Sequence, residues 1–489
     1  MSTRAAAEQR SVRSLIPARM DRLPWTRFHW TVVVGLGVSW ILDGLEIQMV
    51  SANGFAKQLD MNSTEVGLTG TVYLFGQVFG ALIFGRLSDR LGRRRFFIIT
   101  LAIYLIGSGI AGLSFAPWFL WIFRFIAGMG IGGEYTAINS AIDEIIPSRY
   151  RGHVDIAING TYWGGAALGA AANLFLLQEG TALTDSGWGW RIGFFIGPVL
   201  GLIIIFLRRT IPESPRWQVT HGFEQEAEAN VDRIEREVEA ESGKPLERVP
   251  DEKAIDVPVH DRVPFAIVWY TFVHIYPKRA IVAFTMLITQ SFLYNAIFFS
   301  YALVLQNFYK ISNGDVAFYF FPFAIGNLIG PLLLGRLFDT IGRRQMIFAT
   351  YGTSAVVLAV SAALFQADVL TATTQTIFWS VSFFFASAGA SSAYLTVSET
   401  FPLQLRGQAI SYCFAVGQFV GAFAPVIYGS LVGDGTDRGP LAGGYYLGAA
   451  IMLVGGIVAL VLGVAAEGKS LEELSDVDFI EKAEAARAR

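Results

Sequence analysis

Twelve long apolar runs dominate this sequence and limit what the chain can fold into. A bilayer core about 30 Å thick is crossed by roughly 20 apolar residues of α-helix. Runs of about this length lie at 30–56, 65–87, 95–115, 118–142, 154–178 and 191–208, and then at 279–308, 314–337, 345–366, 374–397, 408–433 and 441–466. The pattern predicts an all-α membrane protein with twelve transmembrane helices.

Arginine and lysine residues are distributed unevenly over the connections between these runs. If the N-terminus is cytoplasmic, every second connection faces the cytoplasm, and these connections hold most of the basic residues. The connections predicted to lie outside contain only Lys57, Arg191, Lys310 and Arg438. Because cytoplasmic loops carry an excess of Arg and Lys, we expect a multi-pass protein of the cell membrane with both termini in the cytoplasm.

Composition and residue types argue against several other classes of protein. Only 16% of the residues are charged, against roughly 25% in a typical soluble domain. The single cysteine, Cys413, allows no disulfide within the chain, and the five histidines are not spaced as metal ligands. The sequence contains no P-loop and no pairing of a nucleophile with a base, and its net charge of −3 gives no sign of nucleic-acid binding. We therefore expect neither an enzyme nor a metal protein, and no cofactor.

Polar segments divide the chain into five parts. We expect a cytoplasmic N-terminal segment at 1–29, a six-helix bundle at 30–208, a cytoplasmic linker with helical segments at 209–277, a second six-helix bundle at 278–466 and a cytoplasmic tail at 467–489. The first apolar run is too long for a secretory signal and is interpreted as an uncleaved span. In the linker, charged residues at helical spacing between Glu224 and Glu241 predict a surface helix.

Two motifs occur twice, in the same order and at equivalent places in the two halves. The segment Gly85–Arg94 follows span two and reads GRLSDRLGRR, and the segment Gly335–Arg344 follows span eight and reads GRLFDTIGRR. A second motif contains Glu144 and Arg151 after span four, and Glu399 and Arg406 after span ten. The repetition indicates a duplicated six-span unit, and hence two pseudo-symmetric six-helix bundles with a solute site between them near the membrane midplane.

The charged residues of these motifs are suited to a latch on the cytoplasmic side. A carboxylate at a helix end can accept from backbone N–H groups or pair with arginine, and Glu144 and Glu399 can pair with the neighbouring arginine. Such pairs would form when the inner side is closed and break when it opens. The predicted gating residues are Asp89, Arg93, Glu134, Glu144, Arg151, Asp339, Arg343, Glu399 and Arg406. The alternative is that they only set topology and form structural salt bridges.

These motifs resemble those of the major facilitator superfamily. The segment Gly85–Arg94 is similar to the hallmark motif of that superfamily, and two further motifs resemble its sugar-porter and metabolite–proton symporter branch. They are Arg124-x-x-x-Gly128-x-Gly130-x-Gly132-Gly133-Glu134 in span four and Pro212-Glu213-Ser214-Pro215-Arg216-Trp217 after span six. The resemblance covers nearly the whole chain and implies the major facilitator fold and transport of a small solute.

The chain departs from the sugar-porter pattern where the pattern concerns the substrate. Span seven reads Thr289-Gln290-Ser291-Phe292-Leu293-Tyr294-Asn295, so the second Gln and the Asn of the Gln-Gln-x-x-Gly-x-Asn motif are kept, while the first Gln and the Gly are not. The segment Asp43-Gly44-Leu45-Glu46 in span one is similar to the Asp-Gly-aromatic-Asp signature of aromatic-acid–proton symporters. Two classes of solute therefore stay open: sugars or polyols, and aromatic or other organic acids.

Three ionisable residues are predicted inside the membrane, where a charge costs about 2.5–3.5 kcal/mol or more. They are Asp43 and Glu46 in span one and Arg124 in span four. At 1.5 Å per residue, Glu46 lies roughly 24 Å from the inner face and Arg124 about 9 Å below the outer face, so their side chains can meet. We expect Glu46 to carry the proton, Arg124 to modulate it and Asp43 to titrate or bind solute. The resemblance implies the same role for Glu46, and the alternative is a structural ion pair.

Polar side chains within other spans are candidate solute contacts. They are Asn159 in span five, Gln290 and Asn295 in span seven, Asn327 in span eight and Gln418 in span eleven. A site for hydroxyl groups or a carboxylate needs such donors and acceptors on apolar walls. Each of these side chains could instead hold neighbouring helices together.

Taken together, the sequence predicts a monomeric secondary transporter that takes up a small polar organic solute with protons, by alternating access. Its partners would be the solute, protons and the lipid bilayer, with the proton as coupling ion. A facilitative uniporter or a proton-coupled exporter of the same fold stays open. A nutrient sensor on a transporter fold is a further alternative, although the predicted tail is short.

Overall fold

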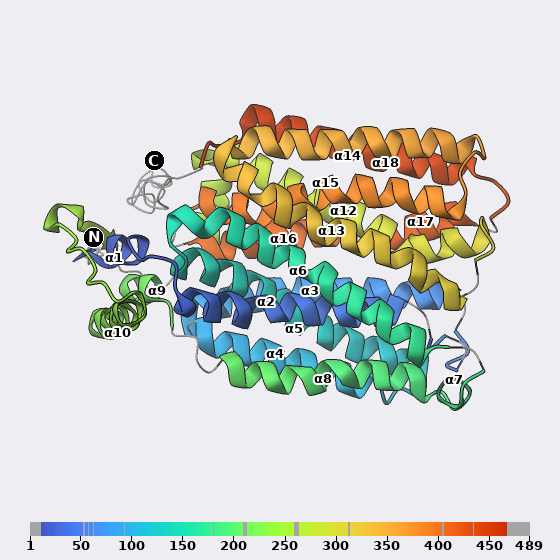
Figure 1. Cartoon of the computed structure of the whole chain (residues 1–489), viewed down its shortest axis with the longest axis horizontal. Coiled ribbons are helices and arrows are strands. Elements are labelled where there is room, and N and C mark those ends of the chain that lie inside the picture. Colours follow the sequence, from blue (N-terminus) through green and yellow to red (C-terminus); the bar gives the residue numbers. More distant parts are fainter. Residues whose placement is uncertain are drawn as a thin grey trace, which may run out of the picture.

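The computed structural model describes residues 11–51, 54–56, 58–61, 63–91, 93–178, 180–208, 213–258, 264–311, 313–402, 405–433 and 435–466. Over these residues, long helices lie side by side in one bundle, and shorter elements lie beyond one end of it (Figure 1). That end is named the linker end here, because the segment that joins the two halves of the chain lies there.

The first half of the chain forms the lower part of the bundle in Figure 1. Its long helices are α2 (Arg27–Ser51), α3 (Ser63–Leu91), α4 (Arg93–Ala111), α5 (Pro117–Ile145), α6 (Ser148–Leu176) and α8 (Trp188–Arg208), and a short helix, α7 (Ala182–Asp185), lies at the end opposite the linker end. The first predicted run extends to residue 56, but helix α2 ends at Ser51, and Gly54 to Ala56 form a turn.

The second half forms the upper part of the bundle. Its helices are α12 (Pro277–Asn307), α13 (Asn313–Thr340), α14 (Arg343–Gln366), α15 (Ala372–Thr400), α16 (Arg406–Gly421), α17 (Ala424–Val432) and α18 (Gly439–Leu462). The run at 408–433 is therefore broken into α16 and α17 rather than forming the single helix predicted. Pro425 lies in the first turn of α17, where its missing N–H is tolerated.

Length and hydropathy alone identify six helical segments, among the described residues, that can cross a membrane. They are Arg27–Gln48, Pro277–Asn307, Asp315–Thr340, Arg343–Gln366, Arg406–Val432 and Gly439–Leu462. The other long helices of the bundle are not all more polar, since α8 is more apolar than α12 or α14. Helix α5 contains Arg124, Glu134 and Glu144, and helix α15 contains many Ser and Thr residues.

Helices of the two halves contact one another along the middle of the bundle. Helix α13 packs along α6, and α16 packs along α3, while α15 also contacts α5 and α6. Within the first half, glycines allow close crossings of the helices. A Cβ atom at Gly165 would lie 1.8 Å from the carbonyl oxygen of Ile41, and one at Gly132 would lie 2.0 Å from that of Gln77. Small residues of this kind hold α2, α3, α5 and α6 close together and thereby fix the position of the site.

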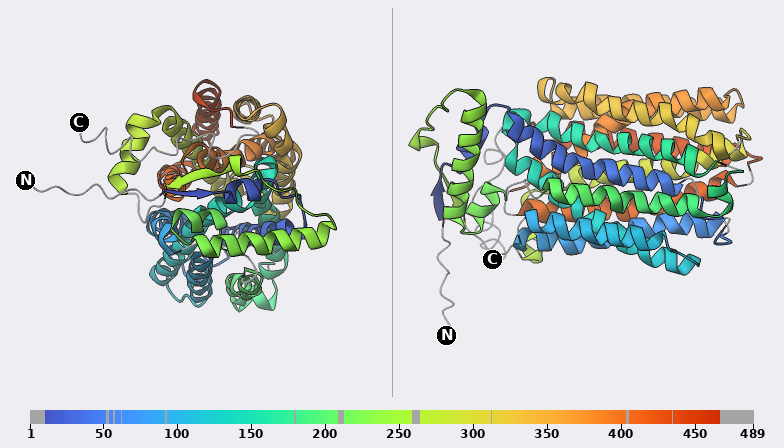
Figure 2. Two further views of the ribbon diagram at one scale, coloured as in Figure 1. Left: turned by 90° about the vertical axis from the view of Figure 1, so that its left-hand side faces the viewer. Right: turned by 60° about the horizontal axis from the view of Figure 1, so that its bottom comes forward.

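The linker end carries a small group of elements built from both the N-terminal segment and the linker (Figure 2). Strand β1 (Ser11–Ser14) pairs with β2 (Ile255–Pro258) in antiparallel register, with Ser11 opposite Pro258. The helices are α1 (Ile16–Asp21), α9 (Pro215–Thr220) and α10 (Glu224–Ser242), a 3₁₀ turn is η1 (Asp251–Lys253), and α11 (Phe265–Tyr270) with the π-helix η2 (Thr271–Ile275) leads into α12. The surface helix predicted between Glu224 and Glu241 is α10.

Ion pairs hold α1 against α10. Arg19 pairs with Glu228, Asp232 and Glu235 at 2.5–2.7 Å, and Arg22 pairs with Glu235 at 2.5 Å. Burial alone would raise the pKa of Glu235, but the hydrogen bonds from Arg19 and Arg22 outweigh it and hold that pKa below the usual value. The apolar face of α10, formed by Ala227, Val231, Ile234 and Val238, is buried.

Asp21 joins the N-terminal segment to the membrane helices. Its carboxylate accepts a 3.0 Å hydrogen bond from the Ser148 N–H at the start of α6, and it pairs with Arg216 at 2.9 Å and with Arg151 at 3.8 Å. Burial alone would raise the pKa of Asp21, but Arg216 and Arg151 hold it below the usual value. The N-terminal segment is therefore a structural part of the linker end.

Candidate functional site

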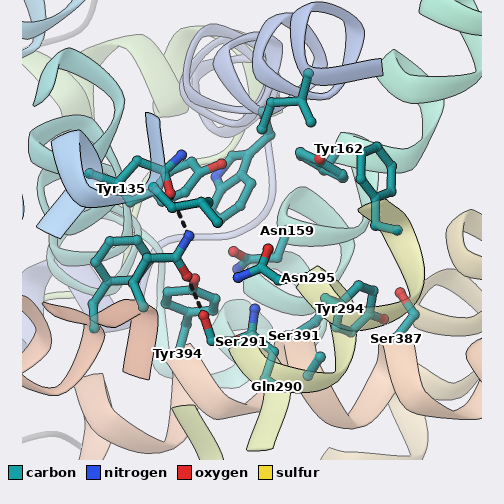
Figure 3. A pocket seen from close by; sticks show the side chains of 18 of the residues that line it. Tyr135, Asn159, Tyr162, Gln290, Ser291, Tyr294, Asn295, Ser387, Ser391 and Tyr394 are labelled. Carbon is teal, nitrogen blue, oxygen red and sulfur yellow. Dashed lines mark hydrogen bonds between the residues drawn. The ribbon is translucent and has the colours of Figure 1, made fainter. Parts of the chain in front are cut away.

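A cavity of about 110 Å³ lies between the two halves of the bundle (Figure 3). Its walls come from α2, α3, α5 and α6 of the first half and from α12, α15 and α16 of the second. The lining residues are Trp40, Ile47, Leu74, Gln77, Tyr135, Asn159, Tyr162, Trp163, Gln290, Ser291, Tyr294, Asn295, Phe298, Phe299, Ser387, Ala390, Ser391, Tyr394, Phe414 and Gln418. The location agrees with the site expected between two repeated halves.

Four of the five polar residues predicted to contact solute line this cavity. Asn159, Gln290 and Asn295 are labelled in Figure 3, and Gln418 completes the set. The Gln418 side chain donates from Nε2 to Gln77 Oε1 at 2.6 Å and accepts a hydrogen bond from Ser291. The bond between Gln418 and Gln77 crosses from the second half of the chain to the first, whereas the bond from Ser291 lies within the second half.

Asn327 was predicted to contact solute, but it is not among the lining residues. It is fully buried behind the wall, where its amide donates to the Phe323 carbonyl at 2.8 Å and accepts from the Tyr294 hydroxyl at 3.1 Å. The amide is already bound on both sides, so Asn327 positions Tyr294, which does line the cavity.

Several polar atoms of the cavity wall have no hydrogen-bond partner among the described residues. They are Nε1 of Trp40, Oε1 of Gln290 and Nδ2 of Asn295. A buried donor or acceptor without a partner costs about 1–3 kcal/mol, so such atoms are expected where a ligand supplies the missing bond. The wall thus offers one unpaired donor from each half of the bundle and one unpaired acceptor from the second half.

An acidic cluster of Asp43, Glu46 and Arg124 lies beside this cavity, within the first half. Arg124 Nη1 donates to Glu46 Oε1 at 2.5 Å, and the two side chains are only 2% and 1% exposed. The contact predicted from the depths of the two residues is therefore present. The Arg124 guanidinium also lies 4.0 Å from the centre of the Tyr73 ring.

Asp43 is held differently from Glu46. It is fully buried, and its carboxylate accepts hydrogen bonds from the hydroxyls of Tyr73, at 2.7 Å, and Tyr135. Tyr135 also lines the cavity, so its ring joins the cavity to the acidic cluster. Trp40, Tyr73, Gln77 and Tyr135 were not predicted from the sequence. The three aromatic residues give no signal of their own in an apolar span until the fold brings them next to a carboxylate, whereas Gln77 is a polar residue in an apolar run and carries the same signal as Gln290.

Part of the predicted latch is assembled at the linker end. Arg343 donates to both carboxylate oxygens of Glu399, at 2.7 and 2.9 Å, and to Asp339 at 2.9 Å. Both oxygens of Glu399 bind Arg343, which belongs to the other motif. Asp339 also lies 3.8 Å from His153 of α6 and so connects the two halves. His153 was not predicted.

The other predicted gating residues are only partly described. Glu134, Glu144, Arg151 and Arg406 are buried, and Arg151 lies against Asp21. The side chains of Asp89 and Arg93 lie outside the described part of the chain.

At the opposite end, Gln48 of α2 donates to the Tyr301 hydroxyl of α12 at 3.2 Å. Contacts between the halves are therefore present on both sides of the cavity along the bundle.

Comparison with known proteins identifies the family. Residues 38–477 match the family described as "Sugar (and other) transporter". The chain belongs to this family. It is 25% identical over 468 residues to the niacin transporter NiaP of Acinetobacter baylyi, covering 94% of this chain and 99% of the relative. It is 26% identical to the inner membrane metabolite transport protein YdjE of Escherichia coli, covering 95% and 99%.

A solved structure of the proton:xylose symporter XylE, bound to 6-bromo-6-deoxy-D-glucose, has the same fold. It matches with a TM-score of 0.74 and 18% identity, and covers 92% of this chain and 98% of XylE. This member of the sugar (and other) transporter family thus has the major facilitator fold, with twelve transmembrane helices in two six-helix bundles. It is a multi-pass membrane transporter of small molecules, and not an enzyme.

Proposed function

We propose that this transporter takes up a small organic solute together with protons. One observation carries the proposal: a buried cluster of two carboxyls and one guanidinium is joined through Tyr135 to the cavity between the halves. Glu46 and Asp43 are the proposed proton-binding groups, and Arg124 is the cation that controls them.

The charge of the cluster supports a proton as the coupling ion. With Asp43, Glu46 and Arg124 all ionised, the cluster carries one net negative charge in a site closed to water. An uncompensated charge in such surroundings is costly, and a single bound proton makes the cluster neutral. A cluster that is neutral only with one proton is suited to carry one across the membrane.

The cavity favours a solute with a flat ring and polar substituents. Nine of its twenty lining residues are aromatic, and, of the lining residues described, none carries a charged side chain. The unpaired Nε1 of Trp40 and Nδ2 of Asn295 could donate to oxygens of the solute, and Oε1 of Gln290 could accept from it. Aromatic acids such as niacin, the named solute of NiaP, are proposed first, and sugars such as xylose second.

The linker end is proposed to face the cytoplasm of a cell membrane. Arg149, Arg343 and Arg344 lie there, next to the N-terminal segment, as the excess of basic residues in cytoplasmic loops requires. Asp339, Arg343 and Glu399 would form a latch that opens when solute is released inward. The other residues proposed for this gate are Asp89, Arg93, Glu134, Glu144, Arg151 and Arg406. Because one chain supplies both walls of the cavity, a monomer is the proposed working unit.

Uptake into proteoliposomes tests the proposal. Vesicles containing the full chain are given labelled niacin, benzoate, xylose or inositol, with and without an inward-directed proton gradient. We expect one of these solutes to accumulate above its external concentration only when the gradient is present. In the Glu46→Gln variant, the same solute should reach only its external concentration.

Three results would contradict the proposal or part of it. Uptake that reaches only the external concentration, whatever the gradient, would make the protein a uniporter. Accumulation driven by an outward-directed proton gradient would mean that protons leave as the solute enters. The protein would then be a proton–solute exchanger, which exports the solute when the proton gradient is directed inward. A Glu46→Gln variant that still accumulates solute would remove the role assigned to that carboxylate.

A further inference from the structure

Tyr135 belongs both to the cavity wall and to the surroundings of Asp43. Its ring is stacked on Trp40, with 4.2 Å between the ring centres and 10° between the planes. On another side it meets Phe414 of α16 edge-on, at 5.5 Å. Trp40 in turn meets Tyr394 of α15 at 5.8 Å. The ring is therefore held between residues of both halves, while its hydroxyl binds a carboxylate of the first half.

A tyrosine hydroxyl has one hydrogen to donate. An ionised Asp43 can only accept hydrogen bonds, and it takes this hydrogen from Tyr135 and a second from Tyr73. Once Asp43 binds a proton, it becomes a donor itself and no longer needs both tyrosines. The Tyr135 hydroxyl is then available to an acceptor in the cavity.

Building on the proposed function, we propose that Tyr135 is the positioning residue that links solute binding to proton binding. Its single hydroxyl hydrogen serves either ionised Asp43 or an acceptor oxygen of the solute. Protonation of Asp43 therefore favours solute binding, and solute binding favours protonation of Asp43, because the linkage between two sites is reciprocal. This is the sign that symport requires.

Tyr73 provides the matched comparison. It makes the same type of bond to Asp43, but it is fully buried and is not among the lining residues. Its hydroxyl can stabilise Asp43 but cannot donate a hydrogen bond to a solute in the cavity. Tyr73→Phe and Tyr135→Phe each remove one hydrogen bond from the same carboxylate, and only the second removes the link to the cavity.

The titratable and charged groups that face Asp43 come from several elements packed around it. They are Glu46 of α2, Tyr73 of α3, Tyr104 of α4, Arg124 and Tyr135 of α5, Tyr162 of α6 and Tyr394 of α15. Within the described residues, Tyr135, Tyr162 and Tyr394 are the members of this set that line the cavity. A change with pH at position 135 could arise from either Asp43 or Glu46. The Asp43→Asn variant separates the two, because a change caused by Asp43 disappears in it.

The test places 3-fluorotyrosine at position 135 of the full chain in lipid nanodiscs and follows its ¹⁹F resonance between roughly pH 5 and 8. No solute is added. We expect the resonance to move between two values as the pH changes, and to stay fixed in Asp43→Asn. The same label at Tyr294, which lines the cavity but donates to Asn327, should not respond.

Uptake by the two phenylalanine variants completes the test, with the four solutes used above. A hydrogen bond to a charged group changes an equilibrium constant roughly ten- to hundredfold. Tyr135→Phe should therefore lose at least tenfold in gradient-driven accumulation, and solute exchange should continue only at a higher KM, because the bond to the solute is lost as well. Tyr73→Phe should keep accumulation and move its pH profile by about one pH unit or more.

The outcomes separate this inference from the proposed function. If wild-type vesicles accumulate solute with the proton gradient, but the ¹⁹F signal at position 135 ignores pH or Tyr135→Phe accumulates like Tyr73→Phe, the inference is overturned and the proposed function stands. If wild-type vesicles never respond to the proton gradient, the proposed function is overturned, and the coupling role of Tyr135 with it.

Discussion

The number of charged groups in the acidic cluster of Asp43, Glu46 and Arg124 leads to a prediction about stability. Wild-type protein has two carboxyls and one guanidinium, and needs one proton to be neutral. Arg124→Met leaves two carboxyls without a cation, so that two protons are needed. Glu46→Gln leaves one carboxyl and one guanidinium, which are neutral together with no proton.

The expected magnitude follows from burial. Arg124 and Glu46 are 2.5 Å apart and almost inaccessible to water, and removing one partner of a buried ion pair costs about 3–5 kcal/mol. Arg124→Met should lose about this much stability at neutral pH, because both carboxyls remain. Glu46→Gln should lose only about 1–3 kcal/mol, the cost of one lost hydrogen bond to a charged group, because Asp43 and Arg124 still balance each other.

Thermal unfolding of purified protein, followed by tryptophan fluorescence in detergent, measures the difference. Arg124→Met should melt well below Glu46→Gln at neutral pH, and should recover much of the loss in acid, where both carboxyls bind protons. Glu46→Gln should show no such recovery. Equal melting temperatures for the two variants, or a loss in Arg124→Met that is the same at every pH, would refute the charge count.

Three further predictions concern other parts of the molecule. Asp21→Asn should speed hydrogen exchange in α1 at neutral pH. Because its neighbours hold the pKa of Asp21 below the usual value, the difference from wild type should persist at the pH where a free aspartate titrates and be lost only at lower pH. Asn295→Ala should raise the KM for uptake at least tenfold, since Asn295 lines the cavity and its Nδ2 has no hydrogen-bond partner among the described residues, whereas Asn327→Ala should mainly lower the melting temperature. Arg343→Gln should increase the labelling of a cysteine placed at position 391 by a thiol reagent added from the linker side. Arg343→Lys should increase this labelling less, because Lys keeps the charge although it loses the paired bonds to Glu399.

The sequence predicted the fold well because membrane spans and topology depend on local composition. An apolar run of sufficient length must become a helix in lipid, whatever its neighbours are. The contact between Glu46 and Arg124 was also predictable, since helix rise converts residue number into depth. The break between α16 and α17 was not predicted, because a proline alone does not mark a break: Pro425 follows this one, but Pro322 and Pro331 lie inside the continuous helix α13.

The site was predictable only in part, since its walls come from helices far apart in the sequence. Polar residues in apolar spans, such as Gln290 and Asn295, stand out by their cost in the membrane. Asn327 stood out for the same reason, although its amide is used within the fold. Tyr135 gave no such signal, because an aromatic residue is ordinary in a membrane helix. The role of Asp21 was hidden as well, because it depends on how the N-terminal segment folds against α6 and α9.

Proton movement during solute uptake is the most direct test of the central claim. The full chain is reconstituted into vesicles that contain a pH-sensitive dye. The solute that accumulates in the uptake assay is then added outside, with no pH gradient imposed. The interior should acidify as the solute enters, and Glu46→Gln should pass the solute with no acidification. Solute entry into wild-type vesicles at constant internal pH would contradict proton coupling through the buried carboxyls.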